Sequence, residues 1–346
     1  MSRPRLALVV IARDEARAIG RCLDSARPFV DDMIVLDTGS LDATAAIAAD
    51  HGARVHHYTW CDDFSAARNA ALDHSDADWN LLLDADEWLA AGGAELAALP
   101  AAGGLLGQIA VISSFDLGGV TESAVNWISR VLPRGVRYTG RIHEQPDSTL
   151  PRRRLALEVG HDGYRDAQLA GKRGRNRALL EKELADHPGD PYLAYQLAKD
   201  HEIHGRYGEA SALFAEARQH VPEAAPYRHD LIVRLLFALK KAGRLDDAVA
   251  LAELEMPHYG DSPDFYFCLG DVLLDCALRD PEQADAVLGM AMEAWERCLE
   301  IGERPELEGA VAGRGSHLAA HNLAVVLQEL GQLERAAQYR ALAARR

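Results

Sequence analysis

Apolar residues in the first half of the chain come in short blocks separated by stretches with helical spacing. Blocks such as 6–12 and 79–83 are typical of strands buried on both faces, while apolar positions in 15–27 recur once per helical turn. Strands that alternate with helices of about ten residues predict a mostly parallel, doubly wound sheet. We expect strands at 6–12, 33–36, 54–58, 79–83, 107–114, 124–132, 136–139 and 155–159, and helices at 15–27, 43–50, 63–74 and 90–100.

The second half shows a different pattern. Strand signals end near residue 164, a helix is expected over 171–187, and a period of roughly 35–40 residues follows, which is typical of helical repeats. Four units resemble tetratricopeptide repeats, whose stacked helix pairs offer a concave surface to a peptide or a partner. Glycines in the expected turns and small residues in the expected helix contacts support this pattern: Gly205, Gly243 and Gly331, and Ala198, Gly270 and Ala324.

Charge and cysteine content narrow the function classes. The 346 residues carry a net charge of −16 and both halves are acidic, which disfavours nucleic acid or an anionic membrane as partner. No apolar run approaches the roughly 20 residues of a membrane span, and the first apolar block is too short for a signal peptide. The 5 scattered cysteines fit free thiols in a reducing compartment. We expect a cytoplasmic protein.

Two carboxylates follow the three leucines of the block 79–83. Alternate residues of an extended chain point the same way, so Asp84 and Asp86 can aim together into the crevice at the C-terminal end of a strand. Such a pair suits a divalent cation, Mg²⁺ or Mn²⁺, that also holds substrate phosphates. A solvated acidic turn is the alternative for an isolated Asp-x-Asp pair.

Polar loops after two other expected strands would line the same edge. Glu15 follows the first strand, and Asp37-Thr38-Gly39 follows the second. A carboxylate at the second position can accept a hydrogen bond from a uracil N–H or a ribose hydroxyl. A plain glycine turn is the alternative.

Four segments carry a family resemblance: VVIARDE (9–15), IVLDTGSLDAT (34–44), DDFSAARNAAL (62–72) and WNLLLDADEW (79–88). In this order and spacing they resemble the family 2 glycosyltransferases of the GT-A fold. One departure is Ala12-Arg13-Asp14, where many members have a Pro-x-Tyr-Asn turn. The resemblance implies a metal held by Asp86 and Asp84, and a nucleotide-sugar site formed by Ala12, Arg13, Glu15, Asp37, Thr38, Gly39, Arg68, Asp84 and Ala85.

The segment Arg141-Ile142-His143-Glu144 adds a second resemblance. It is similar to a motif of those family members that carry tetratricopeptide repeats, including the bacteriocin S-glycosyltransferases. An inverting transferase needs a base that takes the proton of the acceptor. We expect Glu144 to be this base and His143 to contact the metal or the diphosphate. Asp116 and Glu122, on an expected loop, are rival bases, and a buried structural His–Glu pair is the other alternative.

These observations predict a GT-A domain over 1–163 and a tetratricopeptide-repeat domain over 164–346. The expected activity is metal-dependent, inverting transfer of a sugar from a nucleotide-sugar, UDP-linked, to a peptide, protein or glycan acceptor. One alternative is a repeat scaffold with a degenerate nucleotide-binding domain, which the intact set of polar residues opposes. A nucleotidyltransferase would need a glycine-rich basic loop after the first strand, where this chain has Ala12-Arg13-Asp14-Glu15.

Overall fold

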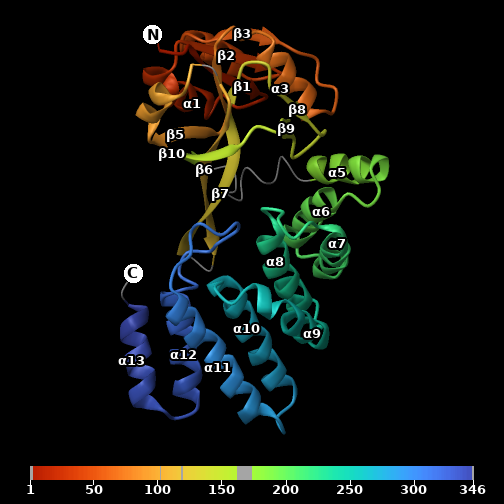
Figure 1. Ribbon diagram of the computed structural model, residues 1–346, viewed down its shortest axis with the longest axis vertical. Helices are drawn as coiled ribbons and strands as arrows, with labels where there is room; N and C mark the ends of the chain where they lie inside the picture. The colour runs from red at the N-terminus through yellow and green to blue at the C-terminus, as the bar shows by residue number, and fades with distance from the viewer. Residues whose placement is uncertain (1–2, 102, 118–119, 162–173, 345–346) are drawn as a thin grey trace. The chain divides into compact units, whose positions relative to one another are not determined.

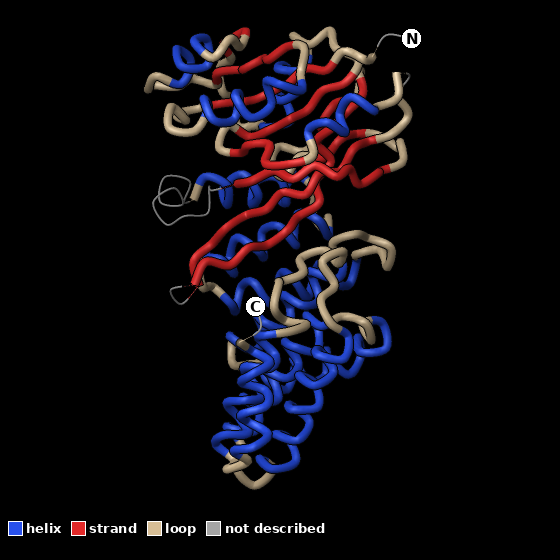
Figure 2. The backbone as a smooth tube through the Cα atoms, turned by 90° about the vertical axis from the view of Figure 1, so that its left-hand side faces the viewer, coloured by secondary structure: helices blue, strands red, loops and turns tan. Residues whose placement is uncertain are grey.

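The structure, a computed structural model, describes residues 3–101, 103–117, 120–161 and 174–344. The chain divides into two compact units, Met1–Glu183 and Leu184–Arg346 (Figure 1). The first contains the strands and the second is helical, which confirms the expected fold class (Figure 2). The domain boundary predicted after residue 163 lies outside the described residues, and the division between the units falls within helix α5 (Arg175–Asp186).

An 8-stranded sheet forms the centre of the N-terminal unit, in the order β3-β2-β1-β4-β7-β6-β10-β5. The first four strands of this order are parallel, whereas β7 is antiparallel to both β4 and β6. A second sheet pairs β8 with β9. The strands are β1 (Leu6–Ala12), β2 (Asp32–Asp37), β3 (Arg54–His57), β4 (Trp79–Asp84), β5 (Glu87–Ala91), β6 (Leu106–Leu117), β7 (Val120–Pro133), β8 (Arg137–Thr139), β9 (Gln145–Asp147) and β10 (Arg152–His161).

Two buried cores cover the two faces of this sheet. Leu8 and Val10 of β1 pack in the core that includes α1 and α2, while Ala7 and Val9 pack in the core that includes α3. This alternation is the period of two that a strand buried on both faces requires. The helices of this unit are α1 (Ile19–Ala26), α2 (Thr44–Asp50) and α3 (Phe64–Leu72), with 3₁₀ turns at Arg27–Phe29 and Gly93–Ala98.

The helix expected over 90–100 is wrong. This segment contains the end of β5, which pairs antiparallel with β10, and then a short 3₁₀ helix. Gly92 has a φ of +79°, and a Cβ there would lie 1.7 Å from the carbonyl oxygen of Ala156. Pairing with a strand more than sixty residues away therefore overrides the helix propensity of the alanines.

Asp116 and Glu122 were expected on a loop, and this expectation is wrong. Their backbone belongs to the β6–β7 ladder, where Asp116 is opposite Thr121 and Glu122 is opposite Phe115. The apolar block that predicted these strands ends earlier than the strands do, because ladder hydrogen bonds continue them beyond the core.

The C-terminal unit consists of consecutive helix pairs, as the repeat period predicted. The short turns within three pairs contain Gly205, Gly243 and Gly331, each at positive φ. Gly270 lies against Trp295, where a Cβ would be 2.5 Å from the indole Nε1. The helices are α6 (Pro191–Ile203), α7 (Tyr207–His220), α8 (Arg228–Lys241), α9 (Leu245–Glu255), α10 (Pro263–Arg279), α11 (Ala284–Ile301), α12 (His317–Glu329) and α13 (Leu333–Ala343), with a 3₁₀ turn at Met256–His258.

A long connection, residues 302–316, joins α11 to α12 and was not predicted. It crosses the N-terminal ends of α8 and α10. The Nδ1 of His229 lies 2.7 Å from the carbonyl oxygen of Glu308. Asp264 accepts hydrogen bonds from the N–H of Val311 and from Arg314, both at 3.0 Å. This connection is therefore packed against two helix pairs that precede it.

Two further facts bear on the class of protein. No helix in the described part of the chain combines the length and apolarity needed to cross a membrane. All five cysteines lie within the described residues and none forms a disulfide.

Candidate active site

The C-terminal ends of β2, β1 and β4 form one edge of the sheet. Ala12 lies opposite Asp37, and Ile11 lies opposite Asp84. Asp37 and Asp84 are therefore two strands apart, roughly 10 Å at ordinary strand spacing. Ligands of parallel α/β sheets bind in the crevice at this edge. The register thus places Asp37 and Asp84, two of the acidic residues singled out in the sequence, at the same edge.

The turn after β2 is built around Asp37, which is 5% exposed. Its two carboxylate oxygens accept the N–H of Ser40 at 3.2 and 3.3 Å. Thr38 donates to the carbonyl oxygen of Ala12 through its N–H at 2.9 Å and its hydroxyl at 3.1 Å. Gly39 has a φ of +103°, so a glycine at this position suits the turn. These bonds fix the turn to the end of β1.

Polar contacts join the loop after β1 to the turn after β2 and to the start of α2. Asp14, at a φ of +54°, accepts the N–H of Leu41 at 2.7 Å. The N–H of Glu15 donates to the hydroxyl of Thr44 at 2.8 Å. Arg13 is exposed. The loops after β1 and β2 therefore form one continuous polar wall beside Asp37.

Arg68 links this edge to the helix behind it. The helix α3 begins after Asp63, whose carboxylate accepts the N–H of Ala66 at 2.9 Å. One turn later Arg68 is 4% exposed, and its Nη2 lies 2.6 Å from Oδ1 of Asp84. Its Nε donates a short hydrogen bond to Oε1 of Glu144. One guanidinium thus joins two carboxylates from distant parts of the chain.

Glu144 belongs to the tight loop between β8 and β9. Gly140 has a φ of +92° and His143 a φ of +52°, so two left-handed residues fold this loop. The N–H of Phe64 donates to the carbonyl oxygen of Arg141 at 2.8 Å, which fixes the loop to the start of α3. The side chain of Glu144 is 10% exposed, whereas His143 is exposed.

Arg130 was not predicted from the sequence as a site residue. This residue of β7 is 7% exposed, and its Nη2 lies 2.8 Å from Oδ2 of Asp84. Oε1 of Glu87 lies 3.7 Å from the same nitrogen. The signal was a single charged residue inside the apolar block 124–132, a position where an arginine needs a buried partner.

His161, at the end of β10, was also missed. Its Nε2 lies 3.6 Å from Oδ2 of Asp86, which is itself 5% exposed. Burial lowers the pKa of His161, but the hydrogen bond and charge of Asp86, with Glu87 and Asp84 nearby, outweigh burial and raise it. The imidazole beside Asp86 thus comes from β10. The strand predicted here ended at residue 159, two residues before His161.

The ionisation of the acids in this cluster depends on their neighbours. Burial alone would raise the pKa of Asp84, but Arg130 and Arg68 hold that pKa well below its usual range. Glu87 behaves oppositely, because burial and the charge of Asp84 raise its pKa to about 7. Perturbed acids of both kinds in one cluster are typical of functional sites.

The donor atoms at this edge fit a divalent cation of the magnesium or manganese type. Among the residues that the structure describes, no group of three or more His, Cys, Asp and Glu side chains is arranged to hold a metal. Asp84 is occupied by two guanidiniums, which leaves Asp86 and the adjacent His161 as oxygen and nitrogen donors. One or two protein ligands are what a cation needs when substrate phosphates supply the rest.

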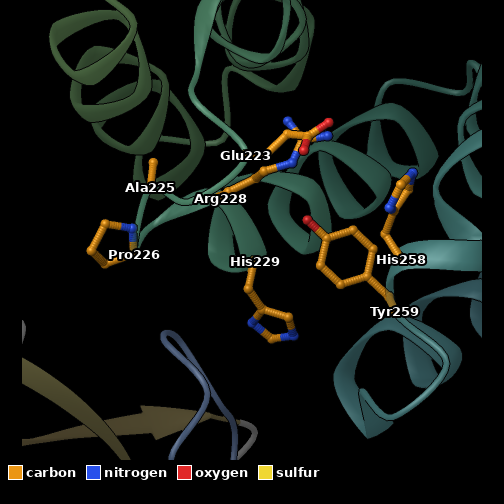
Figure 3. A pocket seen from close by; sticks show the side chains of 7 residues that line it. All are labelled: Glu223, Ala225, Pro226, Arg228, His229, His258 and Tyr259. Atoms are coloured by element: carbon orange, nitrogen blue, oxygen red, sulfur yellow. The ribbon is translucent and has the colours of Figure 1, made fainter.

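A separate cavity of about 360 Å³ lies in the helical unit, beside the start of α8 (Figure 3). Two of its polar lining residues, Arg228 and His229, already have partners. Arg228 pairs with Glu255 at 3.1 Å. His229 uses one ring nitrogen on Glu308 and the other on the hydroxyl of Ser262, both at 2.7 Å. These walls contain no arrangement comparable to the cluster at the sheet edge.

Comparison with known proteins finds similarities in both units of the chain. Residues 7–104 match the model of a family described as glycosyl transferase family 2. A TPR repeat-containing protein of Synechococcus elongatus is 36% identical over 264 residues, covering 71% of this chain and 64% of the relative. The chain therefore spans less than two thirds of that relative. The family match, residues 7–104, contains Asp37, Arg68, Asp84 and Asp86 and ends before Arg130.

Two further similarities are to a curated relative and to a solved structure. The SPbeta prophage-derived glycosyltransferase SunS of Bacillus subtilis is 23% identical over 338 residues, covering 86% of this chain and 80% of the relative. Among solved structures, MamA from Desulfovibrio magneticus has a TM-score of 0.39 and 17% identity, covering 51% of this chain and 89% of that chain.

Proposed function

We propose that this chain, a family 2 glycosyltransferase with tetratricopeptide-like repeats, transfers a sugar from a nucleoside diphosphate sugar to an acceptor with inversion at the anomeric carbon. One observation carries the assignment of roles: Arg68 holds Asp84 and Glu144 together at the sheet edge that also contains Asp37. We assign the donor chemistry to the N-terminal unit.

The nucleoside is assigned to the wall after β1 and β2. Asp37 is buried and can accept from a uracil N–H or a ribose hydroxyl, and UDP is the nucleotide we propose. The roughly 10 Å between Asp37 and Asp84 suits a nucleoside at one end and a diphosphate at the other. The remaining donor contacts that we propose are Ala12, Arg13, Glu15, Thr38, Gly39 and Ala85.

Mg²⁺ or Mn²⁺ is the proposed cofactor, held by Asp86 and His161, with Asp84 and His143 as further candidates from the sequence. When bound, such a cation supplies Lewis-acid stabilisation to the leaving diphosphate. Arg68 supplies fixed positive charge at the same edge, because it is buried and cannot lose its proton. Cation and guanidinium would thus share the negative charge of the leaving group.

Glu144 is the proposed general base. In inverting transfer an acceptor O–H or S–H attacks the anomeric carbon, the bond from this carbon to the diphosphate oxygen breaks, and the acceptor proton passes to the base. Arg68 orients the Glu144 carboxylate from one side. The rival candidates, Asp116 and Glu122, lie on the paired strands β6 and β7.

A peptide or protein side chain is the acceptor that we propose. Stacked helix pairs usually bind extended peptides or partner helices on one surface. The helical unit of this chain contains such pairs, from α6 to α13. A glycan acceptor would leave the presence of this unit without an assigned role.

A thermal-shift panel tests the donor assignment. UDP, GDP, CDP, dTDP and ADP would each be added with and without Mn²⁺. A nucleotide at a hundredfold excess over its Kd raises the free energy of unfolding by about 2.7 kcal/mol. We expect UDP to stabilise the protein and to require the metal. Stabilisation by another nucleotide would change the donor, and no shift with any of them would favour the repeat scaffold.

The metal assignment makes a separate prediction. Asp86→Ala removes the carboxylate beside His161, so we expect metal-dependent turnover of the donor to be lost. Mn²⁺-dependent hydrolysis of UDP-sugars is the measurement, with circular dichroism as the check on folding. Asp62→Ala, a change at an exposed residue in the loop before α3, is the control. Turnover that survives in the Asp86→Ala variant would show that this carboxylate does not hold the metal.

A further inference from the structure

We infer that Arg130 is a positioning residue of the donor site, which acts by fixing the carboxylate of Asp84. The inference rests on the function proposed above and adds to it a residue that lies outside the matched family domain. Three observations carry it: the backbone irregularity at Arg130, the paired contacts with Asp84, and the number of hydrogen bonds that Asp84 can still accept.

The backbone irregularity is a break in the ladder between β6 and β7. Gln108 pairs with Ser129, but the preceding Gly107 pairs with Val131, so Arg130 has no partner in this ladder. A bulge of this kind redirects one side chain and is common beside active sites. The pairing of β7 with β4 also ends at Val131. The bulge therefore turns Arg130 toward β4 where the two strands separate.

Arg130 contacts Asp84 in a forked arrangement. Nη2 lies 2.8 Å from Oδ2 and Nη1 lies 3.4 Å from Oδ1. Buried ion pairs contribute little net stability compared with apolar residues of the same volume. Stability alone therefore does not explain why a charged pair occupies this site, whereas the need to hold one carboxylate in a defined orientation does.

These contacts restrict what Asp84 can bind. A carboxylate offers about four acceptor sites. Arg130 uses two and Arg68 uses a third through its Nη2, so about one is left for a ligand. A group held between two cations is a poor ligand for a third cation, but it can accept one hydrogen bond from a hydroxyl of the bound nucleotide. Asp86 and His161 are then left to hold the metal.

The two arginines also have unused donors. Nε of Arg130 and Nη1 of Arg68 are buried and have no hydrogen-bond partner in the described structure. Buried N–H groups without partners are uncommon and costly, and a phosphate oxygen is a strong acceptor for guanidinium groups. The Nη1 donor of Arg68 supports a diphosphate beside Asp84, while Arg130 acts through Asp84.

The test compares Arg130→Lys, Arg130→Met, Asp84→Asn and the double variant Arg130→Met/Asp84→Asn with the intact protein. Calorimetry measures the affinity for UDP with Mn²⁺, electron paramagnetic resonance measures binding of Mn²⁺ alone, and circular dichroism checks folding. We expect each single variant to weaken UDP binding about 10–100-fold, as is usual for a residue that orients a ligand-binding group. Binding of Mn²⁺ alone should change less than about twofold, and the double variant should be no weaker than either single variant.

Arg134→Met is the matched control, because Arg134 lies just after the same strand and donates to the carbonyl oxygen of Ala77, away from Asp84. Unchanged UDP affinity in a folded Arg130→Met variant, additive effects in the double variant, or loss of Mn²⁺ binding in Asp84→Asn would each overturn the inference. If the methionine variant does not fold, the UDP affinity of the Arg130→Lys variant takes its place in the test. Failure of the intact protein to bind any nucleotide would instead reject the proposed function, and the inference with it.

Discussion

At the scale of single residues, Glu87 couples the charge cluster to the stability of the fold. It is 3% exposed, its Oε2 accepts the N–H of Asp84 at 2.8 Å, and its pKa is raised to about 7. An unfolded chain would titrate this group near 4.3. The folded state therefore holds a proton that the unfolded state releases between these pH values, and the free energy of unfolding falls as pH rises through this window.

Glu87→Gln should remove this pH dependence. Glutamine is neutral at every pH, and its carbonyl can still accept the N–H of Asp84. Urea unfolding in the presence of a chelator, followed by fluorescence at pH 5 and pH 8, measures the difference. Between pH 5 and pH 8 we expect the free energy of unfolding of the intact protein to fall by on the order of 2–3 kcal/mol more than that of the variant. Equal losses would show that Glu87 does not carry the effect.

At the scale of secondary-structure elements, the sequence pattern correctly predicted those strands and helices whose formation depends on nearby residues. The strand expected over 6–12 is β1 to the residue, and α3 differs from its expected bounds by one or two residues. Segment 90–100 was wrong because its partner, β10, is distant in sequence. The same limit applies to the site. Asp37, Arg68, Asp84 and Glu144 stand out in their motifs, but the contacts of Arg130 depend on a bulge, and those of His161 on pairing across the sheet.

Gly92 provides a test of the β5–β10 pairing. Gly92→Ala adds a Cβ at positive φ and 1.7 Å from the carbonyl oxygen of Ala156, so backbone must move. Gly104→Ala is the matched control, since Gly104 has a φ of +99° and no neighbour within 4 Å of the added Cβ. The control should cost about 1–2 kcal/mol of unfolding free energy, and Gly92→Ala clearly more. Equal losses in urea unfolding would contradict the close approach of these two strands.

At the scale of the whole molecule, each unit has its own core. Two core clusters contain only residues of the N-terminal unit, while the large cluster around Phe214 and Trp295 lies within the helical unit. A domain with its own core can in principle fold as a separate unit. Nucleotide affinity should therefore be insensitive to packing defects among the helices.

Phe214→Ala tests this separation. Phe214 is fully buried, so its truncation should cost about 3–5 kcal/mol within the helical unit. We expect a lower melting temperature for the helical signal in circular dichroism, together with unchanged calorimetric affinity for UDP and Mn²⁺ at 25 °C. Leu82→Ala, at a fully buried position in β4, is the contrasting variant and should weaken nucleotide binding. A weaker affinity in the Phe214 variant would show that the two cores are energetically coupled.

The connection 302–316 has a consequence for how the helix pairs could be edited. In a simple array each repeat contacts only its neighbours, so units can be added, deleted or exchanged like modules. Here Glu308 contacts His229 of α8, a helix that precedes it by more than one pair, and Arg314 contacts Asp264 of α10. Deleting the pair α10–α11 would remove Asp264 and with it the contact made by Arg314. The segment from α8 to α12 should therefore be inherited, and engineered, as one indivisible block.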